Sequence, residues 1–559
     1  MLGRFRFSLL PALCAVVFLA GCGGVNPNPV VPPPTGTFTN SSLSGTYIFS
    51  FSGYDLGYGG GSYFAVTGSL TANGSGALTG GSIDIVDPAL GAALNVSSTL
   101  VRVPVSGSYS VTGDGRGSGT LNFTVNGASV QFGLDFVLNS GAHGLITRFD
   151  GNGSGSGSLD VQTGGLTQSS LAGSWAFALN GTDATAWNPL ASAGALTFDS
   201  SGNLTAGVED FNDNGNSAGL QALGVTGSVS VGAPGAAQLT TNAGGFGTMS
   251  FDVWPVDASH FKLIETDGHE NLAGDAVAST GSTAFPSGPL VFTLSGEDSQ
   301  QGSFAAGGLL TSSGSGSITG GLEDVNDEGY VGQAPAVTGS FSSSGPRSVL
   351  TLNGVYNGSF PNYALATGNY TFAVYPFSGG AMLLEIDNGG GSTLGISSGN
   401  LYVQSATAFT VSQGYGLNLS GVNGNGETDW IAEFTANPGS VAGLYDANNS
   451  GYLVPGASLG SGTWSVASNG LGSVSMPGLQ TSGNSMIGAL NLDFYVVDSS
   501  TVVFLETDPN QLGLGAFLVQ NASDAPAAVP SHASGMHLTR PKVFAGRTFR
   551  AAAGATPER

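Results

Sequence analysis

Three acidic loops carry the residues of this 559-residue chain that are best suited to chemistry. In each loop, side chains bearing oxygen alternate with other residues. Oxygens at every second position can converge on a hard cation, while a glycine at the sixth position permits a sharp turn. The pattern therefore predicts weak calcium sites, and calcium is the one cofactor that the sequence suggests. The predicted ligands are Asp210, Asn212 and Asn214 in the first loop, Asp324, Asn326 and Glu328 in the second, and Asp446 and Asn448 in the third.

The same three loops also fit ordinary hairpin turns. A calcium loop between two helices needs a glutamate at its twelfth position, where this chain has Gln221, Pro335 and Ala457. Asp, Asn and Gly are also the residues that turns prefer, because they bond to their own backbone and accept positive φ. The turn interpretation is favoured, and the metal interpretation stays open.

A second recurring pair is Glu-x-Asp. Two carboxylates can serve as acid and nucleophile in glycoside hydrolysis. Residues i and i+2 of one strand share a face, however, and do not flank a substrate. We therefore predict no catalytic residue and no enzymatic activity. The pairs are Glu265 with Asp267, Glu385 with Asp387, and Glu506 with Asp508, and the first copy has Arg148 and Asp150 instead.

These pairs belong to a unit that occurs four times, with a period of about 115–128 residues. Each copy opens with an alternating strand that ends in glycine, continues to a Gly-x-x-Asp segment and closes near the Glu-x-Asp pair. Histidines are few: the repeats hold His143, His260 and His269, and we expect the last two to face solvent. The opening glycines are Gly53, Gly181, Gly296 and Gly421.

The repeats predict an all-β fold of four tandem antiparallel units. Short alternating segments are separated by Asn-Gly and Asp-Gly pairs, which are typical of two-residue hairpins. A meander of eight or nine strands hides its edges by closing, so each repeat is predicted to be a small up-and-down barrel. A two-layer β-sandwich is the alternative. We expect strands throughout each repeat and no helix.

The composition limits the partners. The formal net charge is −24, and the repeats hold only five basic residues, which argues against nucleic acid as a partner. With Cys14 in the leader and Cys22 just after it, the mature chain is expected to have no disulfide. The basic residues of the repeats are Arg102, Arg116, Arg148, Lys262 and Arg347.

The N-terminus has a basic start and a short apolar core that ends in Leu19-Ala20-Gly21-Cys22. This motif resembles the lipobox of bacterial lipoproteins. The resemblance implies cleavage before Cys22, lipidation of Cys22 and attachment to the lipid bilayer. Because Gly23 follows instead of Asp, it also implies the outer membrane of a Gram-negative bacterium.

The expected organisation has seven parts, and its function class is broad. We expect a non-enzymatic structural or adhesion protein of the cell envelope, whose partner is a glycan or a protein at the cell surface. The alternatives are a glycan-binding or carbohydrate-active protein, or a carrier of a small ligand inside one barrel. The parts are a signal peptide (1–21), a lipidated Cys and Pro-rich tether (22–41), repeats at 42–165, 166–283, 284–406 and 407–522, and a basic, disordered tail (523–559).

Overall fold

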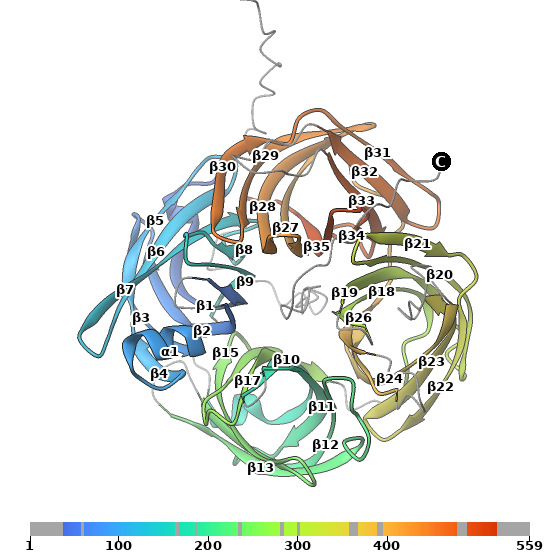
Figure 1. The fold of residues 1–559 in the computed structure, drawn as a ribbon, viewed down its shortest axis with the longest axis horizontal. Helices are drawn as coiled ribbons and strands as arrows, with labels where there is room; N and C mark the ends of the chain where they lie inside the picture. The colour runs from blue at the N-terminus through green and yellow to red at the C-terminus, as the bar shows by residue number, and fades with distance from the viewer. Residues whose placement is uncertain are drawn as a thin grey trace, which may run out of the picture. The chain divides into compact units, whose positions relative to one another are not determined.

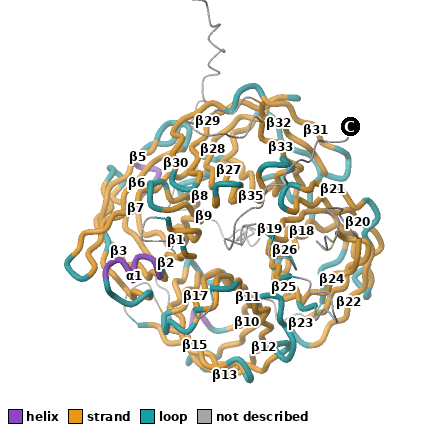
Figure 2. Tube along the Cα trace, in the orientation of Figure 1, coloured by secondary structure: helices purple, strands orange, loops and turns teal. Residues whose placement is uncertain are grey.

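The computed structural model describes residues 37–56, 61–162, 167–184, 187–232, 237–279, 284–298, 302–356, 367–387, 395–477 and 489–522. All of them belong to the larger of two units of the chain, residues 33–559. Cys22, the leader and the basic tail lie outside the described residues. Strands dominate and helices are short (Figure 2). Within the described ranges, no helix combines the length and the apolar character needed to cross a membrane.

Each repeat forms one closed, eight-stranded antiparallel barrel (Figure 1). This confirms the all-β prediction and the barrel form, and it excludes the two-layer sandwich. In the first, third and fourth barrels a ninth strand (β4, β21 or β30) pairs with the third strand of the barrel.

Barrel 1 consists of β1 (Ser44–Asp55), β2 (Ser62–Asn73), β3 (Ala77–Val86), β4 (Thr99–Pro104), β5 (Ser106–Val111), β6 (Arg116–Val125), β7 (Ala128–Leu138), β8 (His143–Arg148) and β9 (Gly153–Val161). Barrel 2 consists of β10 (Gly173–Asp183), β11 (Pro189–Phe198), β12 (Leu204–Asp213), β13 (Leu223–Val231), β14 (Ala237–Ala243), β15 (Gly247–Pro255), β16 (His260–Glu265) and β17 (Glu270–Ser279).

Barrel 3 consists of β18 (Gly288–Glu297), β19 (Ser303–Ser312), β20 (Ser317–Asp327), β21 (Tyr330–Ala334), β22 (Thr338–Ser344), β23 (Arg347–Tyr356), β24 (Thr367–Phe377), β25 (Gly380–Glu385) and β26 (Ile396–Val403). Barrel 4 consists of β27 (Gln413–Asn423), β28 (Gly426–Asn437), β29 (Ser440–Asn449), β30 (Tyr452–Ser458), β31 (Gly462–Val466), β32 (Leu471–Pro477), β33 (Ala489–Val496), β34 (Thr501–Glu506) and β35 (Gln511–Val519). Short 3₁₀ turns, Asn40–Ser42 and Gln168–Leu171, precede barrels 1 and 2.

Closure brings the first and last strands of each barrel together. In barrel 3, β18 pairs with β26 along its length. A Cβ on Gly296 would lie 1.8 Å from the carbonyl oxygen of Ile396. The glycine that marks the start of the repeat is therefore required for close approach of the two strands. The same argument applies to Gly443 of the Gly-x-x-Asp segment, where a Cβ would lie 1.9 Å from the carbonyl oxygen of Glu433.

Alternation fills each barrel with its own apolar side chains. In barrel 1, the buried rings of Phe51, Phe64 and Phe132 meet edge to face, with the centroid of Phe51 5.8 Å from that of Phe64 and 6.1 Å from that of Phe132. Barrel 4 leaves an internal gap of only about 10 Å³ among Phe409, Trp464 and their neighbours. That volume holds at most about one water molecule.

One short helix corrects the expectation of strands throughout. Helix α1 (Pro88–Leu94) follows β3 in barrel 1. Asp87 caps it by accepting a hydrogen bond from the Leu90 N–H at 2.8 Å, and Pro88 stands in the first turn, where its missing N–H costs nothing. Asn95 ends it in the left-handed conformation with φ of 52°. Asp87 and Pro88, which stand where the other three repeats have an acidic loop, thus start a helix.

Candidate functional site

The aspartates of the four Gly-x-x-Asp segments lie at equivalent positions, each on the third strand of its barrel. Each of these residues is less than a tenth exposed. Each carboxylate faces the barrel that follows in the chain, and the last one faces barrel 1. They are Asp84 on β3, Asp210 on β12, Asp324 on β20 and Asp446 on β29.

Asp210 meets the strongest donors. Arg347 of barrel 3 donates to it through Nε and Nη2, each at 2.7 Å. The hydroxyl of Tyr375 donates to the same carboxylate. Both oxygens of Asp210 therefore accept charge-assisted or short hydrogen bonds across the contact between barrels 2 and 3.

The other three aspartates have different donors. The indole Nε1 of Trp254 in barrel 2 donates to Asp84 at 2.6 Å. The hydroxyl of Tyr495 in barrel 4 donates to Asp324, also at 2.6 Å. Nη1 of Arg116 in barrel 1 donates to Asp446 at 2.8 Å. The contacts thus run from each barrel to the next and return from barrel 4 to barrel 1.

The asparagine two residues further on repeats this relation with backbone acceptors. Nδ2 of Asn212 donates to the carbonyl of Glu385 at 3.0 Å, and Nδ2 of Asn326 donates to that of Glu506 at 2.9 Å. Nδ2 of Asn448 donates to the carbonyls of Arg148 at 2.8 Å, Gly153 at 2.7 Å and Asp150 at 3.3 Å. The Oδ1 of each asparagine accepts the N–H of the glycine three residues later.

Apolar contacts accompany these bonds. Trp254 and Ile264 of barrel 2 cluster with Ile48 and Val86 of barrel 1. Val86 stands where the other three repeats have asparagine. At this position barrel 1 makes an apolar contact in place of the hydrogen bond. A second cluster joins barrels 2 and 3, and a third contains residues of barrels 1, 3 and 4.

The predicted calcium ligands therefore lie at the contacts between barrels. Asn214 and Glu328 stand at the turns that follow, with φ of 50° and 47°. Among the described residues, no three His, Cys, Asp or Glu side chains are grouped closely enough to hold a metal ion. Because asparagine and carbonyl oxygens are also calcium ligands, calcium binding at these loops stays a prediction.

The two members of each Glu-x-Asp pair have different structural roles. The aspartates accept backbone N–H bonds from the neighbouring strand: Ser250 donates to Asp267 at 2.6 Å, and Thr371 donates to Asp387 at 2.8 Å. The glutamates point into the barrel interior and are at most 1% exposed. Asp508 and Glu506 repeat this division of roles in barrel 4.

The interior position of these glutamates has different surroundings in each barrel. In barrel 1 it is Arg148, which is fully buried and bonded to Asp55 and Asp150. In barrel 4, Glu506 accepts a hydrogen bond from Gln511 at 2.9 Å and also lies beside the carboxyl of Asp508.

In barrels 2 and 3 the same position is a glutamate among other acids. Burial and the bonded carboxyl of Asp267 raise the pKa of Glu265 to about 9, and burial raises that of Glu209 to about 8. In barrel 3, burial raises the pKa of Glu323 to about 8 and that of Glu385 well above its ordinary value.

A buried cluster of charges joins barrels 1 and 2. Nζ of Lys262 lies 3.1 Å from Asp160 and 3.4 Å from Asp275. Burial works against ionisation of Asp160, but Lys262 and His143 hold the pKa of Asp160 well below its ordinary value. His260 is 4% exposed and bonds to Asp275 at 2.8 Å, so the expectation that it faces solvent is wrong. His260 is the first residue of β16, and its side chain contacts the neighbouring strand. The charged residues around it in the sequence gave no sign of this contact. His269 is exposed, as expected.

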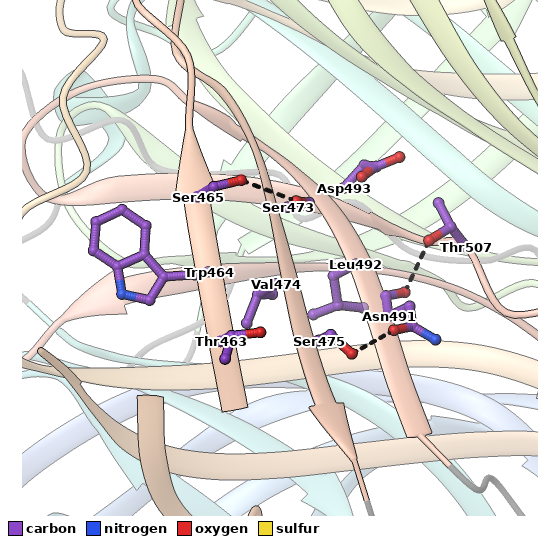
Figure 3. A pocket seen from close by; sticks show the side chains of 10 residues that line it. All are labelled: Thr463, Trp464, Ser465, Ser473, Val474, Ser475, Asn491, Leu492, Asp493 and Thr507. Atoms are coloured by element: carbon purple, nitrogen blue, oxygen red, sulfur yellow. Dashed lines mark hydrogen bonds between the residues drawn. The ribbon is translucent and has the colours of Figure 1, made fainter. Parts of the chain in front are cut away.

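A groove of about 300 Å³ lies over strands β31, β32 and β33 of barrel 4 (Figure 3). Its floor consists of hydroxyl and amide side chains, and Ser475 donates to Asn491 at 2.7 Å. The indole of Trp464 projects away from Asn491 in this view, so it offers no stacking platform beside the polar groups. Burial and the nearby Asp324 raise the pKa of Asp493, at the edge of the groove, to about 6.

Comparison with known proteins adds little. No protein-family model matches the chain, and no curated protein matches it. A double mutant of transferrin-binding protein B from Haemophilus parasuis Hp5 is 9% identical, with a TM-score of 0.19 over 67% of this chain and 82% of its own. Intact Ap-TbpB, with N and C lobes, is 9% identical, with a TM-score of 0.16 over 68% and 84%. Likenesses this weak do not bear on the function of this chain.

Proposed function

We propose that this chain is a lipid-anchored, non-enzymatic protein of the cell envelope, whose four barrels form a coupled scaffold for binding at the cell surface. One observation carries the scaffold role: the recurring Asp and Asn side chains bond to the neighbouring barrel. The residues that repetition made the best candidates for chemistry thus join barrels together. The lipobox supports the anchor and the location, with the outer membrane of a Gram-negative bacterium as the proposed site.

Labelling with an alkyne analogue of palmitate in a Gram-negative host tests the anchor. The wild-type chain should take up the label and sediment with outer membranes. Cys22→Ala should lose both properties, and Cys14→Ala is the matched control that should keep them. A wild-type chain that stays unlabelled, or a label that survives Cys22→Ala, would refute the anchor.

The groove on barrel 4 favours a glycan as the partner over an apolar ligand. Its lining offers several hydroxyls, the amide of Asn491 and the carboxyl of Asp493, and such groups suit a polyhydroxylated ligand. A glycan array probed with the purified chain tests this. Binding that is lost in Asn491→Ala and kept in Asn353→Ala, on the third barrel, would support the groove. Binding that both variants keep would place the glycan elsewhere.

A further inference from the structure

Barrel 1 holds an organic cation of its own, the buried guanidinium of Arg148, against two aromatic rings and two carboxylates. The Cζ of Arg148 lies 4.9 Å from the ring centroid of Phe64 and 4.7 Å from that of Phe132. Its Nη1 donates to Asp55 at 2.9 Å and its Nε to Asp150 at 3.1 Å. Aromatic faces and carboxylates together are the groups that stabilise a buried guanidinium.

Barrel 3 keeps the aromatic and acidic parts of this site, but among its described residues no cation occupies them. The strand registers of the two barrels correspond at this site, because Leu134 pairs with Arg148 as Phe372 pairs with Glu385. In barrel 3, the carboxyl group of Glu385 therefore stands where barrel 1 has the guanidinium of Arg148. The equivalent residues are Phe304 for Phe64, Tyr370 for Phe132, Asp298 for Asp55, Asp327 for Asp87, Asp387 for Asp150 and Glu385 for Arg148.

Three carboxyl oxygens of this site lack hydrogen-bond partners in the described part of the chain. Asp327 is 1% exposed, and neither of its oxygens has a hydrogen-bond partner in the described part of the chain. Oε1 of Glu385 is in the same state, while Oε2 accepts a bond from Ser397 at 2.6 Å. Buried polar atoms without partners are costly, and a native fold keeps few of them.

These groups act on one another across the barrel interior. Burial, followed by Glu385, Glu323, Asp327 and Asp298, raises the pKa of Tyr370 well above its ordinary value. Burial and the neighbouring Asp298 likewise raise the pKa of Asp327 well above its ordinary value. Burial and the neighbouring acids therefore disfavour the charged form of these carboxyls, and a bound cation would favour it.

We propose that Asp327 and Glu385, together with the rings of Phe304 and Tyr370, form a binding site in barrel 3 for a guanidinium-bearing organic cation. The ligand takes the place that Arg148 fills in barrel 1. A metal ion fits less well, because no three acidic side chains in the described ranges are grouped for one. The ring centroids of Phe304 and Tyr370 are 6.3 Å apart, so binding requires the rings to separate. This inference names a ligand class for the proposed binding function and rests on it.

Calorimetric titration of the purified full-length protein with methylguanidinium at pH 8 tests the proposal. Binding should release protons, which two buffers of different ionisation enthalpy would measure. Asp327→Asn and Glu385→Gln should each weaken binding roughly tenfold, as expected when a charge-assisted bond is lost. Glu265→Gln is the matched control in barrel 2, where Leu190 and Met249 replace the rings, and it should bind as the wild type does.

Glu385→Arg supplies a second, independent readout. It recreates the arrangement of barrel 1, so it should abolish methylguanidinium binding and raise the melting temperature. No heat of binding in the wild type, or equal weakening by Glu265→Gln, would overturn the proposal. If circular dichroism shows that Glu385→Gln is unfolded, the binding test relies on Asp327→Asn. Palmitate labelling of Cys22 is measured separately, so failure here leaves the anchor standing.

Discussion

At the scale of single residues, the buried charges of barrel 1 depend on Arg148. Its side chain is fully buried and pairs with Asp55 and Asp150, whose carboxylates would otherwise lack a cation. Breaking a buried pair by removing one partner costs about 3–5 kcal/mol, because the remaining charge is uncompensated. We therefore expect Arg148→Met to lower the free energy of unfolding by about that amount, measured by urea denaturation. Arg102→Met, at a partly exposed contact with Asp252, should cost less. An equal loss in both variants would contradict this role.

The buried glutamates predict an unusual pH dependence of stability. Glu265 has a pKa of about 9 in the folded protein, against an ordinary value of 4.5. The folded state therefore holds a proton that the unfolded chain releases above pH 4.5. The contribution is complete below that pH and is lost as the pH rises through about 9, with a slope of up to about 1.4 kcal/mol per pH unit.

We expect the free energy of unfolding to fall between pH 5 and pH 9. Urea denaturation at intervals of one pH unit measures this fall. Glu265→Gln should flatten part of this fall, because its amide does not titrate. The control is Glu328→Gln, the same substitution in a partly exposed turn, and it should leave the slope nearly unchanged. A wild-type stability that rises over this range would contradict the assignment.

At the scale of elements, the strand that carries each Gly-x-x-Asp segment is both a barrel wall and a contact between barrels. Asp210 on β12 meets Arg347 at the start of β23 through two bonds of 2.7 Å. A double-mutant cycle of Asp210→Asn and Arg347→Met should give a coupling energy of about 1–3 kcal/mol. Urea denaturation of the four proteins measures it. A coupling near zero would mean that the pair adds nothing to the contact between the barrels.

The sequence predicted these elements better than it predicted their use. Alternation and the Asn-Gly and Asp-Gly pairs located the strands, and the opening glycines marked where each barrel closes. The partners of the aspartates could not be found this way. The donors are Trp254, the pair Arg347 and Tyr375, Tyr495, and Arg116. The aromatic donors share one position of the repeat and the two arginines share another, but neither position holds a donor in every copy. Only the aspartate is the same in all four copies, so the repeated pattern indicated a loop and gave no sign of the contact between barrels.

At the scale of the whole molecule, equivalent contacts have unequal consequences. Asn326 joins barrels 3 and 4, which follow one another in the chain, and donates to the carbonyls of Glu506 at 2.9 Å, Asp508 at 3.1 Å and Gln511 at 2.9 Å. Asn448 makes the same three bonds between barrels 4 and 1, which are the most distant in sequence. A short connection keeps the first pair of barrels close when their contact is weakened, whereas the second pair has no such tether.

Asn448→Ala and Asn326→Ala form a matched pair that measures this difference. Each removes three hydrogen bonds to backbone carbonyls, so the local cost is similar. We expect Asn448→Ala to separate barrels 4 and 1 more completely, because loop-closure entropy then opposes their reassociation across the whole chain. Differential scanning calorimetry should show the unfolding transition broaden or split in Asn448→Ala and stay a single, slightly lowered transition in Asn326→Ala. Identical transitions would mean that the contact between barrels 4 and 1 does not couple their unfolding, and that each barrel responds to its own contacts alone.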